Sequence, residues 1–226
     1  MSAMNSFISR DGLTGYLLTD TACTLLPGDV GANGFPGKVV SLPHMRTAFA
    51  TCGYAHLGSP FQMLASQFSS FDDLAKEFRP RWQHATSNLS AVAESSGLPK
   101  INCAVLCMGW SDTESRVKAF IAQTTKQWEP QFFDLILTPD ADIETVQHHD
   151  FAGPVLFATP ARDLLRIMQV QRANAMRAED DGHRGLIGGA VVLTELTRDS
   201  VTQRIVHNWR QDEIVMRLNK AAGKAA

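Results

Sequence analysis

The order of the predicted elements indicates an α+β protein with two β-sheets whose outer faces are covered by helices. β-favouring runs occupy both ends of the chain, and a block of helical periodicity lies between them. The strongest local signal is a late hairpin, in which the runs Leu186–Leu196 and Val201–His207 flank the turn Arg198-Asp199-Ser200. Two sheets, each with helices on one side, accommodate this order of elements in a single domain.

The two strands of this hairpin differ in their predicted environment. The first run is apolar on both of its alternating faces except at Glu195, which is typical of a strand covered from both sides. The second run alternates apolar and polar residues more openly. We therefore expect the first strand inside a sheet and the second nearer to an edge.

The N-terminal part of the chain is predicted to consist of short strands. Gly12–Thr19 is the first candidate, and it ends at Asp20. Thr21–Leu26 is a candidate return strand, and a glycine-rich segment follows it. Lys38–Leu42 and Arg46–Cys52 then form a pair around a Pro-His turn.

Two helical regions are predicted. The first begins at Ser59-Pro60, because proline is tolerated in a first helical turn, and its apolar spacing continues to Val92. Pro80 interrupts that spacing and predicts a kink or two helices, and Gly97 ends the region. The second begins at Thr159-Pro160, and its apolar face is formed by Leu164, Ile167, Met168, Gln171 and Ala175.

Three further strands are predicted between these helical regions, at Ile101–Met108, Arg116–Gln123 and Phe132–Leu137. The polar segment Thr138–Gly153 is expected to be a loop with a short helix. No repeat or long linker divides the chain, so residues 1–216 are predicted to be one domain, followed by a frayed tail at 217–226.

The composition excludes several classes of function. The 226 residues carry a formal net charge of −2, which gives no strong attraction to nucleic acid or to an anionic membrane. No apolar run approaches the roughly 20 residues that a membrane span needs, and the first residues lack the pattern of a signal peptide. We expect a cytoplasmic protein without a nucleic-acid or membrane partner.

The four cysteines are predicted to be reduced thiols. Cys103 and Cys107 share one face of a predicted strand but lie about 13 Å apart at ~3.3 Å per residue, which is too far for a disulfide or one metal shell. Cys23 and Cys52 have no near partner in the sequence.

Three ligand-site motifs are incomplete, so no cofactor and no metal is predicted. The segment GANGFPGK has Ala32 and Val39 where a phosphate-binding loop needs glycine and a hydroxyl residue. The acidic alternation from Asp140 has Thr145 where a calcium loop needs glycine. His148-His149 are adjacent and have no accompanying cluster of cysteine or histidine.

Three segments resemble the proteasome-like branch of the N-terminal-nucleophile (Ntn) hydrolases, in particular its bacterial and phage-borne members. They are GLTGYLLTD, GKVVSLPHMRTAFATCG and GGAVVLTELTRDSVTQRIV, and the likeness covers about three quarters of the chain. The resemblance implies a four-layer αββα sandwich. It also implies a homo-oligomer and, for an active member, a peptide or small amide substrate.

The resemblance also implies a site. Asp20 matches the aspartate and Lys38 the lysine beside the family's nucleophile, which is a Thr, Ser or Cys at the start of the chain. Burial of the lysine near an N-terminal amine lowers the pKa of that amine, so the amine can accept the hydroxyl proton. The family's spacing places the nucleophile at Met4, whereas Ser2 is two residues earlier and Ser6 two residues later.

Two hypotheses of different class follow. In one, the protein is an amide-bond hydrolase whose nucleophile is Ser2, exposed by removal of Met1, with Asp20 and Lys38 beside it. In the other, it is a catalytically silent Ntn-fold protein that assembles or binds partners, and this hypothesis explains the absent threonine with fewer assumptions. Under both, the strands that begin at Gly12 and Lys38 are expected side by side, with Lys38 paired to Asp20. Under the silent hypothesis the first six residues overshoot or block the pocket.

Overall fold

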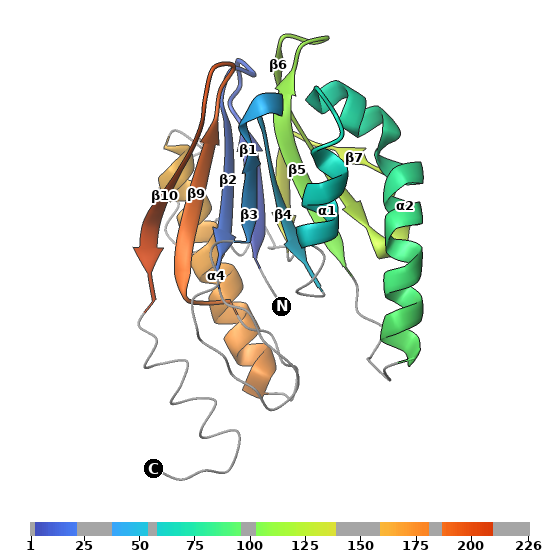
Figure 1. Ribbon diagram of the computed structural model, residues 1–226. Helices are drawn as coiled ribbons and strands as arrows, with labels where there is room; N and C mark the ends of the chain where they lie inside the picture. Colours follow the sequence, from blue (N-terminus) through green and yellow to red (C-terminus); the bar gives the residue numbers. More distant parts are fainter. Residues whose placement is uncertain are drawn as a thin grey trace.

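The computed structural model of the protein describes residues 3–21, 38–53, 58–95, 103–138, 159–180 and 187–209. These residues form a mixed α+β structure with two antiparallel sheets (Figure 1). Its α-helices are α1 (Gly58–Ala65), α2 (Phe71–Ser95) and α4 (Pro160–Asp180). The predicted α+β class is confirmed.

The first sheet, called sheet A below, contains strands from both ends of the chain. Its strand order is β10-β9-β2-β1-β8, and every neighbouring pair is antiparallel. The strands are β1 (Met4–Ile8), β2 (Gly15–Asp20), β8 (Leu135–Thr138), β9 (Ala190–Leu196) and β10 (Val201–Asn208). The N-terminal strand therefore lies inside this sheet, between β2 and β8.

The second sheet, called sheet B, follows the order of the chain, β3-β4-β5-β6-β7. Its strands are β3 (Val39–Leu42), β4 (Thr47–Cys52), β5 (Ala104–Ser111), β6 (Arg116–Gln123) and β7 (Gln131–Phe132). Single turns of 3₁₀ helix at Pro43–Met45 and Thr124–Lys126 follow β3 and β6. The strands predicted around Lys38–Leu42, Arg46–Cys52 and Arg116–Gln123 are confirmed.

Three clusters of buried side chains place the core. One lies between the sheets and joins residues such as Met4 and Leu17 of sheet A to Leu106 and Met108 of sheet B. A second packs the other face of sheet B against α1 and α2, and a third packs the other face of sheet A against α4. Figure 1 shows α4 beside sheet A, with α1 and α2 on the far side of sheet B.

The late hairpin has the predicted pairing. β9 lies between β2 and β10, and its Leu193 is 1% exposed. β10 is the outer strand of sheet A among the described residues, and most of its side chains are exposed. The prediction of an inner strand followed by a strand at an edge is therefore confirmed.

Two strands differ from the sequence-based predictions. β1 was not predicted, because MNSFI is short and mixes polar and apolar residues, so only its tertiary partners reveal it as a strand. The predicted strand Phe132–Leu137 is in fact two strands, since β7 ends at Phe132 in sheet B and β8 begins at Leu135 in sheet A. The strand propensity of Phe132–Leu137 predicts an extended backbone, but it does not show that the chain crosses from sheet B to sheet A within this segment.

The helices agree with their predicted apolar faces. All five predicted positions of α4 are buried, Ala175 being the most exposed of them at 7%. Pro80 lies inside α2, which remains one helix and changes direction along its length (Figure 1). Proline removes one backbone hydrogen bond and crowds the preceding turn, which accounts for a bend without a break.

Several predictions lie outside the described residues. These are most of Thr21–Leu26, the glycine-rich segment around Ala32, the helix end at Gly97, most of Thr138–Gly153 with its acidic and histidine motifs, Cys23, and the tail at 217–226. No helix in the described ranges is long and apolar enough to cross a membrane.

Candidate functional site

The candidate site is built around Asp20, the last residue of β2. Its side chain is completely buried and accepts hydrogen bonds from separate segments of the described chain, at Ala3, Lys38 and Gly188. The backbone N–H of Ala3 donates to Oδ1 at 2.9 Å, the Lys38 ammonium donates to the same oxygen at 2.7 Å, and the backbone N–H of Gly188 donates to Oδ2 at 3.2 Å. One carboxylate thus joins the start of β1, the approach to β3 and the approach to β9.

The strand register explains why Ala3 reaches this carboxylate. β1 and β2 pair with Met4 opposite Thr19, so the next residue toward the N-terminus lies beside Asp20. The backbone N–H of Asp20 in turn donates to the Ala3 carbonyl at 3.4 Å. On the other side of β2, the backbone N–H of Thr21 donates to the Ala190 carbonyl at 2.9 Å, which holds the approach to β9 at the same end of the sheet.

Lys38 and Asp20 form the predicted ion pair, but the strands that carry them do not lie side by side as predicted. The strands that follow Gly12 and Lys38 were expected side by side, but β2 lies in sheet A and β3 at the edge of sheet B. The pair therefore links the two sheets at one end of the molecule. Only 12% of the Lys38 side chain is exposed, so both charges are largely removed from water and depend on each other.

The register also changes the relation between the site and the N-terminus. The spacing along the sequence predicts the nucleophile position at Met4, but the Met4 side chain is fully buried in the core between the sheets. Across the β1–β2 ladder it is Ala3 that lies beside Asp20. The Ala3 nitrogen belongs to the peptide bond with Ser2, which itself lies outside the described residues.

Ser6 is not at this site. It lies opposite Leu17 in the middle of the β1–β2 ladder and is fully buried. In the part of the chain that the structure describes, its hydroxyl has no hydrogen-bond partner. The structure therefore leaves Ser2 as the hydroxyl residue next in the chain to the Asp20 contact.

A thiol lies near the ion pair. Cys52, the last residue of β4, packs against the core between the sheets, and burial raises the pKa of its thiol while the Lys38 charge opposes that shift. Cys52, Cys103 and Cys107 form no disulfide, and Cys103 and Cys107 pack in the same cluster on the outer face of sheet B. The prediction that Cys103 and Cys107 share a face without a bond is confirmed.

Sequence reasoning did not predict the two backbone donors on Asp20. Gly188 lies inside the predicted run Leu186–Leu196, and Ala3 lies inside the first six residues, which the silent hypothesis expects to overshoot or block the pocket. A backbone N–H carries no residue-type signal, so its position follows from strand pairing alone. The adjacent Gly189 has φ +73°, a left-handed backbone that favours glycine and that turns the chain into β9.

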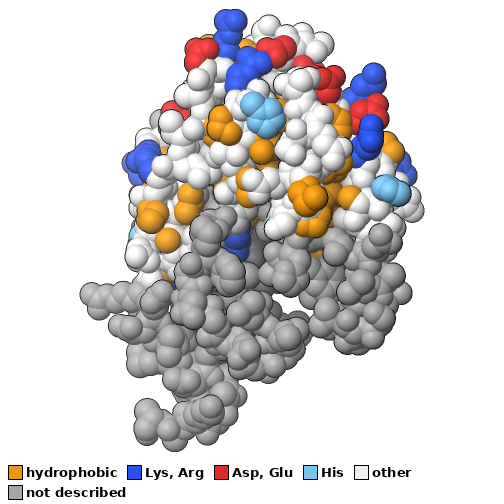
Figure 2. All heavy atoms as spheres, viewed as in Figure 1, with side chains coloured by type: hydrophobic (Ala, Val, Ile, Leu, Met, Phe, Trp, Pro, Cys, Tyr) orange, Lys and Arg blue, Asp and Glu red, His pale blue; other side chains and the backbone are white. Residues whose placement is uncertain are grey.

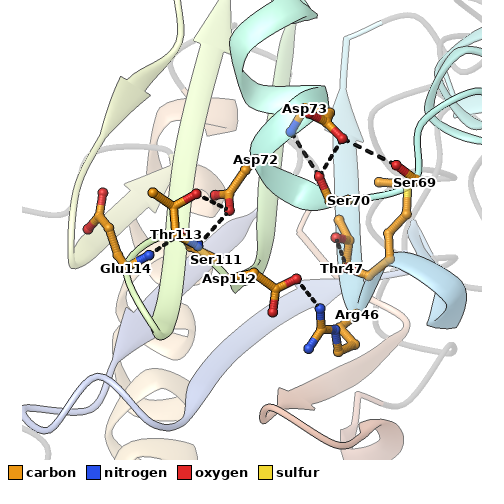
Figure 3. A network of polar contacts seen from close by, with 11 residues as sticks. Arg46, Thr47, Ser69, Ser70, Asp72, Asp73, Ser111, Asp112, Thr113 and Glu114 are labelled. Atoms are coloured by element: carbon orange, nitrogen blue, oxygen red, sulfur yellow. Dashed lines mark hydrogen bonds and ion pairs between the residues drawn. The ribbon is translucent and has the colours of Figure 1, made fainter.

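A second polar region lies at the turn between β5 and β6, at the end of the molecule opposite to the end of β2 (Figure 1), and Figure 3 shows its contacts. Asp72 near the start of α2 accepts hydrogen bonds at 3.0 Å from the backbone N–H and the hydroxyl of Thr113, in the turn between β5 and β6. Ser70 caps the helix by accepting from the Asp73 backbone at 3.1 Å. Asp112 of the same turn pairs with Arg46 and lines an open cavity of about 590 Å³.

This second region is a structural contact between a helix and a hairpin. Partial burial raises the pKa of Asp72, but hydrogen bonds from Ser111 and Thr113 outweigh it and leave that pKa below its usual value. Figure 2 shows Lys, Arg, Asp and Glu side chains gathered at one end of the visible face. In the described ranges, no group of three or more His, Cys, Asp or Glu residues is arranged to hold a metal ion.

No protein-family model matches this chain, and no curated protein matches it significantly.

Proposed function

We propose that this protein is an N-terminal-nucleophile amide hydrolase with a four-layer αββα sandwich. Ser2, exposed by removal of Met1, is the proposed nucleophile, and Lys38 and Asp20 are the proposed neighbours that activate it. The observation that carries the proposal is the buried Lys38–Asp20 pair, whose carboxylate also holds the N-terminal strand at Ala3.

The arrangement of the core supports the fold part of the proposal. Two antiparallel sheets pack face to face, and helices pack on the outer face of each sheet. This is the layering that the resemblance to the proteasome-like Ntn hydrolases implies. The aspartate and the lysine that match the family lie at one end of the sheets, beside the N-terminal strand.

Distances at Asp20 support the assignment of Ser2. Ala3 N and Lys38 Nζ bond to the same carboxylate oxygen at 2.9 and 2.7 Å, so the two nitrogens are separated by less than about 6 Å. Ser2 is covalently attached to the first of these nitrogens. A chain that begins at Ser2 therefore has a hydroxyl group on its first residue. That residue is joined by one peptide bond to the Ala3 nitrogen, which is held close to the Lys38 ammonium.

The proposed chemistry needs only groups of this chain, the substrate and water. The Ser2 hydroxyl attacks the substrate carbonyl, and the free α-amine of Ser2 accepts its proton. The amine leaving group takes that proton as the C–N bond breaks, which leaves an ester on Ser2. Water then hydrolyses the ester and restores the hydroxyl. The nearby Lys38 charge keeps the α-amine unprotonated by lowering its pKa, and Asp20 positions Lys38.

A catalytically silent Ntn-fold protein is the second candidate. It is favoured by the structural use of the Asp20 carboxylate, which ties three segments together whether or not any reaction occurs. The absence of a threonine at the position matched by Met4 also favours it. In this candidate the ion pair is a structural remnant, and the protein acts by assembly or by binding.

Two measurements distinguish the candidates. Intact-mass analysis of the purified protein shows whether Met1 is removed. Hydrolysis of a panel of peptide amides and ester substrates is then compared for wild type, Ser2→Ala and Lys38→Met, with Ser6→Ala as the matched control at the buried serine. The hydrolase proposal expects a mass that lacks Met1, and turnover that is lost in Ser2→Ala and retained in Ser6→Ala. Retention of Met1, or absence of turnover in the wild type, supports the silent candidate instead.

A further inference from the structure

Among the residues that the structure describes, β10 is the outer strand of sheet A, and its backbone groups on the outer side have no partner strand. β10 has eight residues, and the side chains from Thr202 to Ile205 are all exposed, with Ile205 at 66%. In the described ranges only β9 pairs with it. A long exposed edge strand is a template for another strand, and natural proteins usually cover or interrupt it.

The hydrogen-bond register determines which residues of β10 direct their backbone outward. At the hairpin turn the backbone N–H of Thr197 donates to the Ser200 carbonyl at 2.9 Å, so these two residues form the first hydrogen-bonded pair. Hydrogen-bonded and non-hydrogen-bonded pairs then alternate along β9 and β10. Two residues further along each strand, Glu195 pairs with Thr202, and then Leu193 pairs with Arg204. These are the bonded pairs, so the backbone groups of Thr202 and Arg204 point toward β9.

Within the regular stretch from Val201 to Ile205, the other three residues therefore direct their N–H and C=O groups away from the sheet. They are Val201, Gln203 and Ile205, and the irregularity between Ile205 and His207 ends the regular stretch. The hydrogen bonds between β9 and β2 agree with this pattern. The backbone N–H of Thr21 donates to the Ala190 carbonyl, so the backbone groups of the even-numbered residues of β9 point toward β2 and those of the odd-numbered residues point toward β10.

We propose that β10 is a homodimer interface at which a second copy of this chain pairs antiparallel with it about Gln203. In this register Gln203 lies opposite Gln203 of the second copy, and Val201 lies opposite its Ile205. All three outward-facing residues then take part, which gives about six backbone hydrogen bonds in hydrogen-bonded pairs. Any other two-fold register uses fewer of them.

The side chains on both faces fit this register. Val201 packs against the core between the sheets, and Ile205 of the second copy would lie next to it, so the exposed isoleucine extends that core across the interface. On the opposite face, Arg204 of the second copy would lie opposite Thr202, and Glu195 lies directly behind Thr202 on β9.

Charge complementarity also favours a second copy as the occupant. Neighbouring strands are about 4.8 Å apart, so Glu195 and Arg204 of the second copy lie about 10 Å apart at their backbones, within the combined reach of the two side chains. Two-fold symmetry repeats the pair. In the described part of the protein, neither Glu195 nor Arg204 forms an ion pair within its own chain.

The test is the oligomeric state of the full chain, measured by sedimentation velocity at increasing protein concentration. Wild type is expected to dimerise. Gln203→Pro removes an N–H that points away from β9, so it is expected to prevent dimerisation while the hairpin stays folded by circular dichroism. Ile205→Lys is a second variant that is expected to do the same without any change to the backbone.

Charge reversal tests the register itself. Arg204→Glu and Glu195→Arg are each expected to weaken the dimer at least tenfold, and the double variant is expected to recover most of the loss. Arg198→Glu, in the exposed turn, makes the same charge change outside the paired stretch and is expected to leave the dimer intact. A monomeric wild type, a dimer that tolerates both Gln203→Pro and Ile205→Lys, or an Arg198→Glu as disruptive as Arg204→Glu would overturn the proposal. Hydrolase activity enters none of these measurements, so this inference and the proposed function fail separately.

Discussion

Replacement of Lys38 by methionine tests how far the ion pair at Asp20 stabilises the fold. Methionine retains much of the side-chain length and removes the charge. The variant removes the Lys38 ammonium from a carboxylate that is 0% exposed, while the backbone N–H groups of Ala3 and Gly188 still donate to it. Removal of one partner from a buried ion pair destabilises a protein by about 3–5 kcal/mol.

The lower part of that range applies here. The Lys38 side chain keeps 12% of its surface exposed, and the two backbone donors remain to stabilise the carboxylate. We therefore expect Lys38→Met to lower the free energy of unfolding by about 3 kcal/mol. Within the 5–15 kcal/mol that is typical of a folded domain, this is a large fraction of the total.

Urea denaturation followed by tryptophan fluorescence and circular dichroism measures this change. Lys118→Met is the matched control, because Lys118 pairs with Glu114, of which 48% is exposed, and lies over the Phe132 ring, contacts that together should contribute about 1 kcal/mol. Asp20→Asn and the double variant complete a cycle, in which the double variant should be less destabilised than the sum of the single ones. If the effects of the single variants are additive, or if Lys38→Met destabilises no more than Lys118→Met, the buried Lys38–Asp20 ion pair does not stabilise the fold as expected.

Two further predictions concern the opposite end of the molecule. Asp72→Asn should destabilise the fold by about 1 kcal/mol at pH 7, because the Asp72 carboxylate accepts the Thr113 hydrogen bonds. The pKa of Asp72 is lowered in the folded state, so this contribution to stability is present above the usual value of 3.8 and is lost as the pH falls through the folded-state pKa. Urea titrations at acid pH should therefore give the same stability for wild type and variant. Gly109→Ala should lower the melting temperature measured by calorimetry, because the added Cβ would lie 2.3 Å from the Phe71 ring and must displace the ring, at a cost of roughly 1–3 kcal/mol. A melting temperature equal to that of wild type would contradict this packing.

The sequence predicted those parts of the fold that local pattern encodes. Apolar alternation identified the hairpin β9–β10 and the order of its inner and outer strands. Helical spacing identified the buried face of α4, and the cysteine spacing gave the shared face of Cys103 and Cys107. These features depend on neighbours a few residues apart, so periodicity is sufficient to detect them.

The candidate site was predicted only in part. The pairing of Lys38 with Asp20 followed from the family resemblance and from the need of a buried ammonium for a carboxylate. That the pair joins two different sheets did not follow, because the sequence does not state which strands share a sheet. The same limit caused the division of Phe132–Leu137 between the sheets to be missed.

The position of the N-terminus relative to Asp20 was decided by tertiary structure alone. Counting residues along the chain placed Met4 at the site, whereas pairing across the ladder places Ala3 there. The two counts differ because the first follows spacing along the chain and the second follows the hydrogen-bonded register of β1 and β2. Sequence determines the residues that a strand contains, but the register of hydrogen bonds determines which of them meet, and that register is selected by the burial of side chains such as Met4 and Leu17 between the sheets.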